Sequence, residues 1–232
     1  WGNLVTLDWW GELYLNEGYA SMIEFKGQNK VNSSWSIYDQ FLSADQHGAL
    51  RADMLKSSRP LNSQTIVTPE QATAVFDTVS YSKGCAILWM IEAYVGQTNF
   101  RDGNRKYLDA RKFATATSEQ MLGYFDEYVA AKTNQKFTKT YDLFRSYIDQ
   151  SGFPILSTKR AGSVNGQTII TITQKPYVGD SKVTWNVPIK YKTPYGEFED
   201  LLTSTEPLRL VVKLNSNDWF KLNSDSDGYY MV

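Results

Sequence analysis

Apolar side chains recur at helical intervals along the chain as far as Gly152. In residues 9–26 they fall at mixed spacings of three and four, which predicts a partly buried helix. Residues 84–95 are apolar on nearly every side, which predicts a helix inside the core. Ser118 is expected to cap another helix, whose apolar face holds Met121, Leu122, Phe125 and Val129. A last amphipathic helix groups Leu143, Phe144, Tyr147 and Ile148.

The apolar period becomes two after Pro154, as is typical of strands. Strands are predicted at residues 168–173, 187–191, 208–214, 219–222 and 229–232. They are separated by turn signals, namely Asn165-Gly166, Gly179-Asp180, Pro194-Tyr195-Gly196 and Asp227-Gly228. Short strands with regular turns predict a small β-sandwich. The sequence therefore predicts an α+β chain, helical over residues 1–153 and a β-sandwich over residues 154–232.

Composition is that of a folded protein, with 42% hydrophobic and 14% aromatic residues, which argues against disorder. A net charge of −1 argues against nucleic acid as a partner. No apolar run reaches the roughly 20 residues of a membrane helix. Cys85 is the single cysteine and is expected to be a buried small hydrophobe.

The segment with the most chemical information is Leu15-Asn16-Glu17-Gly18, in the first predicted helix. It follows Trp1-Gly2-Asn3-Leu4-Val5-Thr6 and the pair Trp9-Trp10. A glutamate in a helix is by itself most often a solvated surface residue. The whole run, however, resembles the gluzincin zinc aminopeptidases of family M1, of the aminopeptidase N-like type.

The resemblance implies a role for Glu17. In family M1 a His-Glu-x-x-His motif just upstream of such a run supplies two zinc ligands, and the glutamate of LNEG supplies the third. A catalytic zinc commonly takes three protein ligands and keeps its fourth position for water. Glu24 follows Glu17 two helical turns later on roughly the same face, and is expected to help hold the ligands in place.

A second matching segment is Phe76-Asp77-Thr78-Val79-Ser80-Tyr81-Ser82-Lys83-Gly84. In the family, a tyrosine in this context directs its hydroxyl at the substrate carbonyl oxygen, and Tyr81 matches it. Such a donor stabilises the oxyanion of the transition state. Phe76 matches a residue that lines the pocket for the first substrate side chain. Simple packing is the equally weighted alternative for Phe76.

Further segments match the family in the expected order and extend the resemblance over essentially the entire chain. Residues 53–60 resemble a D-A-L-x-S-S-H-P segment, with Arg59 in place of the usual histidine. Residues 148–154 resemble a W-x-x-Q-x-G-x-P junction, with Ile148 near the usual tryptophan. His47 is the only histidine and lies in a loop-like context, so it is expected to be a surface loop residue and not a metal ligand.

The resemblance places the second zinc-binding histidine just before Trp1, so the chain is expected to be a piece of an enzyme cut between its metal ligands. The His-Glu-x-x-His glutamate, which acts as general base, and the segments that capture the substrate amine are also upstream in the family. Zinc is therefore expected in the intact parent enzyme, and neither catalytic zinc nor turnover in this chain alone.

Two functions remain open for the parent protein. The first is a zinc aminopeptidase that removes N-terminal residues from peptides, with peptides as its partners. The alternative is a catalytically dead relative that serves as a binding or receptor ectodomain. The sequon Asn32-Ser33-Ser34 favours an extracellular or membrane-anchored location, although the family also has cytosolic members. Apolar surface left by a missing upstream helix is expected to promote association of the chain.

Overall fold

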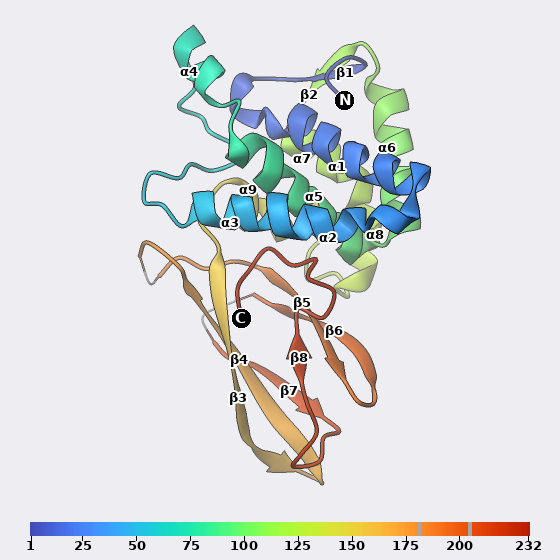
Figure 1. Ribbon diagram of the computed structural model, residues 1–232, viewed down its shortest axis with the longest axis vertical. Helices are drawn as coiled ribbons and strands as arrows, with labels where there is room; N and C mark the ends of the chain where they lie inside the picture. The colour runs from blue at the N-terminus through green and yellow to red at the C-terminus, as the bar shows by residue number, and fades with distance from the viewer. Residues whose placement is uncertain (181, 204–205) are drawn as a thin grey trace. The chain divides into compact units, whose positions relative to one another are not determined.

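The computed structural model describes residues 1–180, 182–203 and 206–232 and divides into two units, Trp1–Gly152 and Phe153–Val232. The first unit is mostly helical and the second consists of strands and loops (Figure 1). The chain is therefore α+β, as the sequence predicts. None of the helices among the described residues has the length and apolar content needed to cross a bilayer.

The first unit is built from helices joined by short connections, with one pair of short parallel strands. Its strands are β1 (Val5–Leu7) and β2 (Ala114–Ala116). Its longer helices are α1 (Tyr14–Val31), α3 (His47–Asp53), α5 (Gly84–Val95), α6 (Gln97–Arg111), α8 (Asp126–Lys132) and α9 (Thr140–Ile148). Its shorter helices are η1 (Trp10–Glu12), η2 (Ser33–Trp35), α2 (Ile37–Gln40), α4 (Pro69–Ala74), α7 (Ser118–Leu122) and η5 (Gly123–Phe125). Two further segments, η3 (Phe41–Gln46) and η4 (Val79–Lys83), are π-helical.

Helix α5 is the centre of this unit, as its apolar sequence predicts. All of its residues except Trp89 and Ala93 are buried. Helix α1 packs along it and contributes the fully buried Tyr14, Tyr19 and Met22 (Figure 1). Helix α1 begins at Tyr14 and not at the predicted residue 9, because Trp9 is extended and a turn of 3₁₀-helix precedes the α-helix.

The predicted cap at Ser118 is wrong by one residue. Thr117 is the N-cap of α7, with a capping box in which its hydroxyl accepts from the Gln120 N–H and the Gln120 side chain accepts from the Thr117 N–H. Ser118 is instead the first helical residue and is fully buried. The predicted apolar face is confirmed, since its four side chains Met121, Leu122, Phe125 and Val129 are inaccessible.

The described residues of the second unit form two three-stranded sheets, in the orders β3-β4-β7 and β6-β5-β8. Every pair is antiparallel. The strands are β3 (Pro154–Val164), β4 (Gln167–Pro176), β5 (Val187–Thr193), β6 (Gly196–Leu202), β7 (Leu208–Val212) and β8 (Lys221–Leu222). Asn165 and Gly166 both have positive φ, 50° and 74°, in the two-residue turn that joins β3 to β4.

Two strands of the second unit were not predicted from the sequence, and two predicted strands are mostly absent. Strands β3 and β6 lie at sheet edges and are largely exposed, so their sequences lack apolar alternation. Residues 229–232 do not form a strand, and only Met231 makes an isolated bridge, to Ile155. Of the predicted strand at residues 219–222, only Lys221–Leu222 pairs, because Trp219 lies in an exposed loop.

Candidate active site

Helices α1 and α5 approach each other closely because a glycine from each lies at the contact. A β-carbon added at Gly18 would lie 2.8 Å from the Gly84 carbonyl carbon, and one added at Gly84 would lie 2.8 Å from the Tyr14 β-carbon. Real β-carbons do not approach so closely, so only glycine fits at either position. Glu17 directly precedes Gly18, and η4 runs directly into Gly84. The contact therefore brings Glu17 and the η4 segment together.

Tyr81 and Glu17 meet at this contact. Both side chains are half-buried, and the Glu17 carboxylate lies near enough to the Tyr81 hydroxyl to influence its ionisation. Burial raises the pKa of Tyr81, and the nearby Glu17 carboxylate raises it further, through its negative charge and as an acceptor that favours the protonated hydroxyl. The phenol therefore stays protonated at neutral pH and keeps its O–H available as a donor. The structure thus pairs one acceptor carboxylate with one neutral hydroxyl donor.

Phe76 lies in the turn before η4, with 48% of its surface exposed. Its ring centroid is 6.1 Å from that of Trp10, tilted by 51°. Both rings line a mostly apolar cavity of about 380 Å³ together with Trp9, Ile66, Pro69 and Thr73. Phe76 is therefore a wall of a solvent-accessible cavity and is not buried in the core.

Glu24 is exposed on α1, two turns beyond Glu17, and its Oε1 accepts a hydrogen bond of 3.0 Å from Gln28 Nε2. Two turns of helix span about 10 Å along the axis, too far for a direct contact between the two carboxylates of a straight helix. Glu24 thus lies on the helix that holds Glu17 but outside the Glu17–Tyr81 pair. Its predicted role in holding the site remains a prediction.

The remaining candidates lie elsewhere. His47 is exposed, but it begins helix α3 and is not in a loop, which corrects the sequence prediction. Cys85 is fully buried in α5, and burial raises the pKa of its thiol, so the prediction of a small buried hydrophobe is confirmed. The Asn32 side chain accepts hydrogen bonds from the Ser34 N–H and hydroxyl at the end of α1.

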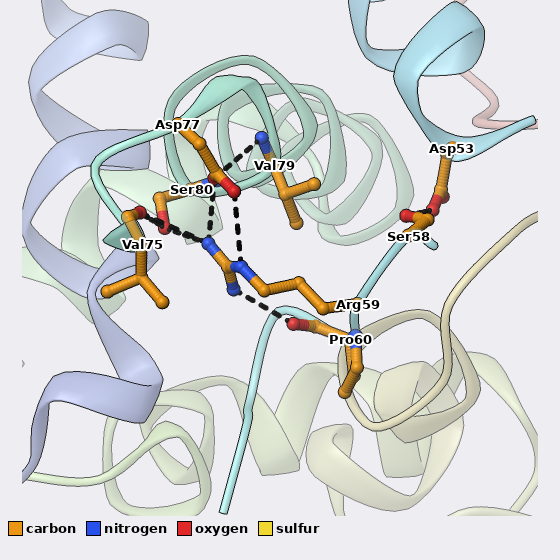
Figure 2. A network of polar contacts seen from close by, with 8 residues as sticks. All are labelled: Asp53, Ser58, Arg59, Pro60, Val75, Asp77, Val79 and Ser80. Atoms are coloured by element: carbon orange, nitrogen blue, oxygen red, sulfur yellow. Dashed lines mark hydrogen bonds and ion pairs between the residues drawn. The ribbon is translucent and has the colours of Figure 1, made fainter. Parts of the chain in front are cut away.

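The contacts of several polar residues in the segments that flank Tyr81 were not predicted from the sequence. Asp53 and Lys83 form a buried ion pair. Arg59 binds Asp77 in the turn that leads to Tyr81 (Figure 2). All four lie in the two segments that match the family, residues 53–60 and 76–84. That match was the one sequence signal that could have marked them as functional residues. Their pairing depends on tertiary contact and has no periodic signature.

The site by itself does not fit a catalytic zinc. Such an ion takes three protein ligands, and within residues 1–180, 182–203 and 206–232 no three His, Cys, Asp or Glu side chains converge. Glu17 offers one carboxylate, and the single histidine lies on another helix. These residues could contribute one ligand to a site completed by others.

Comparison with known proteins matches residues 1–143 to the peptidase family M1 domain. Human glutamyl aminopeptidase is 34% identical over 251 positions that cover 100% of this chain and 24% of that protein. Rat aminopeptidase N is 30% identical, with 100% and 25% covered. The tricorn protease-interacting factor F2 of Thermoplasma volcanium is 28% identical, with 100% and 28% covered. The chain spans about a quarter of the length of these relatives, and it belongs to the peptidase M1 family.

Proposed function

We propose that this chain is part of a zinc-dependent aminopeptidase that removes N-terminal residues from peptides. The observation that carries the proposal is the close approach of the Glu17 and Tyr81 segments, which the glycine contact of Gly18 and Gly84 allows, in a chain of the M1 family. Relatives named glutamyl aminopeptidase and aminopeptidase N support the reaction class. A catalytically dead receptor would have no chemical need for either side chain.

In this proposal Tyr81 is the oxyanion donor. Its raised pKa keeps the hydroxyl protonated, so it can donate to a substrate carbonyl oxygen that gains negative charge in the transition state. Phe76 contributes a wall of the pocket for the first substrate side chain, which its position on an open apolar cavity supports. The peptide is thus bound along the surface formed by η4 and the turn before it.

Glu17 contributes one of three zinc ligands, and Glu24 helps to hold the site from the same helix. The chain has a single histidine and no His-Glu-x-x-His sequence, so residues 1–232 alone are proposed to be inactive and to lack catalytic zinc. One carboxylate binds zinc weakly because affinity depends on several ligands held jointly. Zinc-dependent peptide turnover by pure residues 1–232 would contradict this.

We also propose domain assignments and a location. Residues 1–153 form the C-terminal part of a thermolysin-like catalytic domain, which the helical first unit supports, and residues 154–232 form a β-sandwich, which the two antiparallel sheets support. The sequon at Asn32 supports an extracellular or membrane-anchored location. Glycosidase treatment of the native protein should then remove mass from the peptide that contains Asn32.

The test uses the full-length protein that contains this chain, loaded with zinc. It should release N-terminal residues from peptides, and N-acetylated peptides should resist. Tyr81→Phe should lower kcat by about 10²–10³-fold without loss of zinc. Glu17→Ala should lower the zinc content measured by mass spectrometry. A folded, zinc-loaded protein that cleaves no peptide would overturn the proposal and favour the binding ectodomain.

A further inference from the structure

One side chain from outside the turn holds the segment between Phe76 and Tyr81. The Arg59 guanidinium donates to both carboxylate oxygens of Asp77, from Nε at 3.2 Å and from Nη2 at 2.7 Å (Figure 2). Nη2 also lies 3.1 Å from the Val75 carbonyl oxygen and 2.7 Å from the Ser80 hydroxyl, so its two N–H groups are shared among three acceptors. Nη1 donates to the Pro60 carbonyl at 3.0 Å. Arg59 thus binds the chain on both sides of Phe76 and directly before Tyr81.

Asp77 in turn organises the start of the π-helical segment η4. Its Oδ1 accepts from the N–H groups of Val79 and Ser80, each at 3.0 Å, and its carbonyl accepts from the Tyr81 N–H at 3.1 Å. The buried Ser80 hydroxyl donates to the Val75 carbonyl at 2.6 Å, which closes the turn. Arg59 therefore binds the part of the backbone that determines the position of Tyr81. Single π-helical turns occur often at functional sites.

The other end of η4 is fixed by a second ion pair. Lys83 Nζ lies 2.7 Å from Asp53 Oδ2, and both side chains are 0% exposed. Lys83 also donates to the Gln150 carbonyl at 3.3 Å. Asp53 and Arg59 belong to one segment, in which the Ser58 hydroxyl donates to Asp53 (Figure 2). Tyr81 thus lies between two anchors that come from residues 53–59.

We propose that Arg59 is a positioning residue that sets the direction of the Tyr81 hydroxyl through Asp77 and η4. The catalytic consequence rests on the proposed function, but the structural one does not. A planar guanidinium can satisfy Asp77, Val75 and Ser80 at once, whereas a lysine ammonium cannot reproduce its forked geometry. Arg59 replaces the histidine that is usual at this position in the family, and the sequence alone gives no indication of this positioning role.

The position of Arg59 predicts which kinetic constant changes. Tyr81 is proposed to act on charge that develops only in the transition state, so a misplaced hydroxyl lowers kcat with little effect on substrate binding. In the full-length zinc-loaded protein, Arg59→Ala should lower kcat by about 10–100-fold. Arg59→Lys and Asp77→Asn should give smaller losses of the same kind.

A double-mutant cycle separates positioning from general stability. If Arg59 acts through Tyr81, Arg59→Ala should have almost no further effect on kcat in the Tyr81→Phe background. An equal factor in both backgrounds overturns the proposal. Lys26→Ala is the matched control, because it breaks another half-buried ion pair of the same unit, 2.7 Å from Glu92. It should lower the melting temperature while kcat stays unchanged.

A measurement that does not depend on peptidase activity distinguishes the positioning role of Arg59 from the proposed function. With 3-fluorotyrosine at position 81 of the full-length protein, Arg59→Ala should shift and broaden the fluorine signal, and Lys26→Ala should leave it unchanged. Arg59→Lys and Asp77→Asn replace Arg59→Ala if that variant does not fold. An unchanged signal in the Arg59 and Asp77 variants overturns the positioning role. Absence of peptidase activity with a shifted signal overturns only the proposed function.

Discussion

At the residue scale, the buried ion pair of Asp53 and Lys83 is a polar contact on which the stability of the helical unit depends. Burial lowers the pKa of Lys83, and the charge and hydrogen bond of Asp53 oppose that shift. Asp53 Oδ1 also accepts from the Gly152 N–H at 2.8 Å. Each partner therefore compensates the desolvation of the other, and neither has access to water.

Lys83→Met should lower the free energy of unfolding by about 3–5 kcal/mol, because it leaves the Asp53 charge buried without its cation. The double variant Asp53→Asn with Lys83→Met should lose less, since the new amide side chain keeps an oxygen for the Gly152 N–H and no charge stays buried. Urea denaturation of the parent chain and the single and double variants measures this. A double variant as unstable as the sum of the single losses would contradict the interpretation.

Glu12 is a second buried charge that the sequence did not single out. Its Oε1 accepts from the Ser118 N–H at 2.8 Å, and the Tyr14 hydroxyl donates to the Ser118 hydroxyl at 2.7 Å. Burial raises the pKa of Glu12 above 4.5, although the hydrogen bonds from Ser118 lower it in part. The folded state therefore binds a proton more readily at Glu12 than the unfolded chain does.

This shift predicts the sign of a pH dependence. The contribution of Glu12 to stability is complete below pH 4.5 and is lost as the pH rises through the raised folded-state pKa. Glu12→Gln keeps the acceptor oxygen but cannot ionise. The variant should therefore gain stability relative to the parent chain as the pH rises from about 4 to 7. Urea unfolding at a series of pH values measures this, and parallel curves would contradict it.

At the scale of elements, the close approach of α1 to α5 depends on Gly18 and Gly84. Gly18→Ala should lower the free energy of unfolding by about 1–3 kcal/mol, because its β-carbon would meet Gly84 backbone. Gly27→Ala is the control in the same helix, since its β-carbon would meet nothing within 4 Å. It should stabilise the chain by about 0.5–1 kcal/mol. Thermal unfolding distinguishes them, and equal effects would refute the packing argument.

Element types were predictable where one face of the element is buried. Helix α5 was predicted because it is apolar on nearly every side, and the central strands β4 and β5 were predicted because their apolar residues repeat with the period of a strand. The edge strands β3 and β6 were missed because edges are kept polar and exposed. The cap at Thr117 was missed by one residue because Thr117 and Ser118 are both good capping residues.

At the scale of the whole molecule, the boundary between the units follows Gly152. The Gly152 N–H and the Gln150 carbonyl are partners of the buried Asp53 and Lys83, so these last residues belong to the helical unit. A chain of residues 1–152 should therefore unfold cooperatively. A chain of residues 1–149 should be less stable by about 1–3 kcal/mol, because buried polar groups lose partners. Circular dichroism melts compare them, and equal melts would contradict this.

Sequence patterns were sufficient for several of the helices and the central strands, the α+β class, and the identity of Glu17, Tyr81 and Phe76 as candidates, since periodicity and motifs are local properties. That Tyr81 lies close to Glu17, and that Arg59 binds the turn before Tyr81, depended on the tertiary structure. These contacts join residues far apart in the chain. The closeness of Glu17 to Tyr81 depends on how closely α1 and α5 pack, and Gly18 and Gly84 allow that packing.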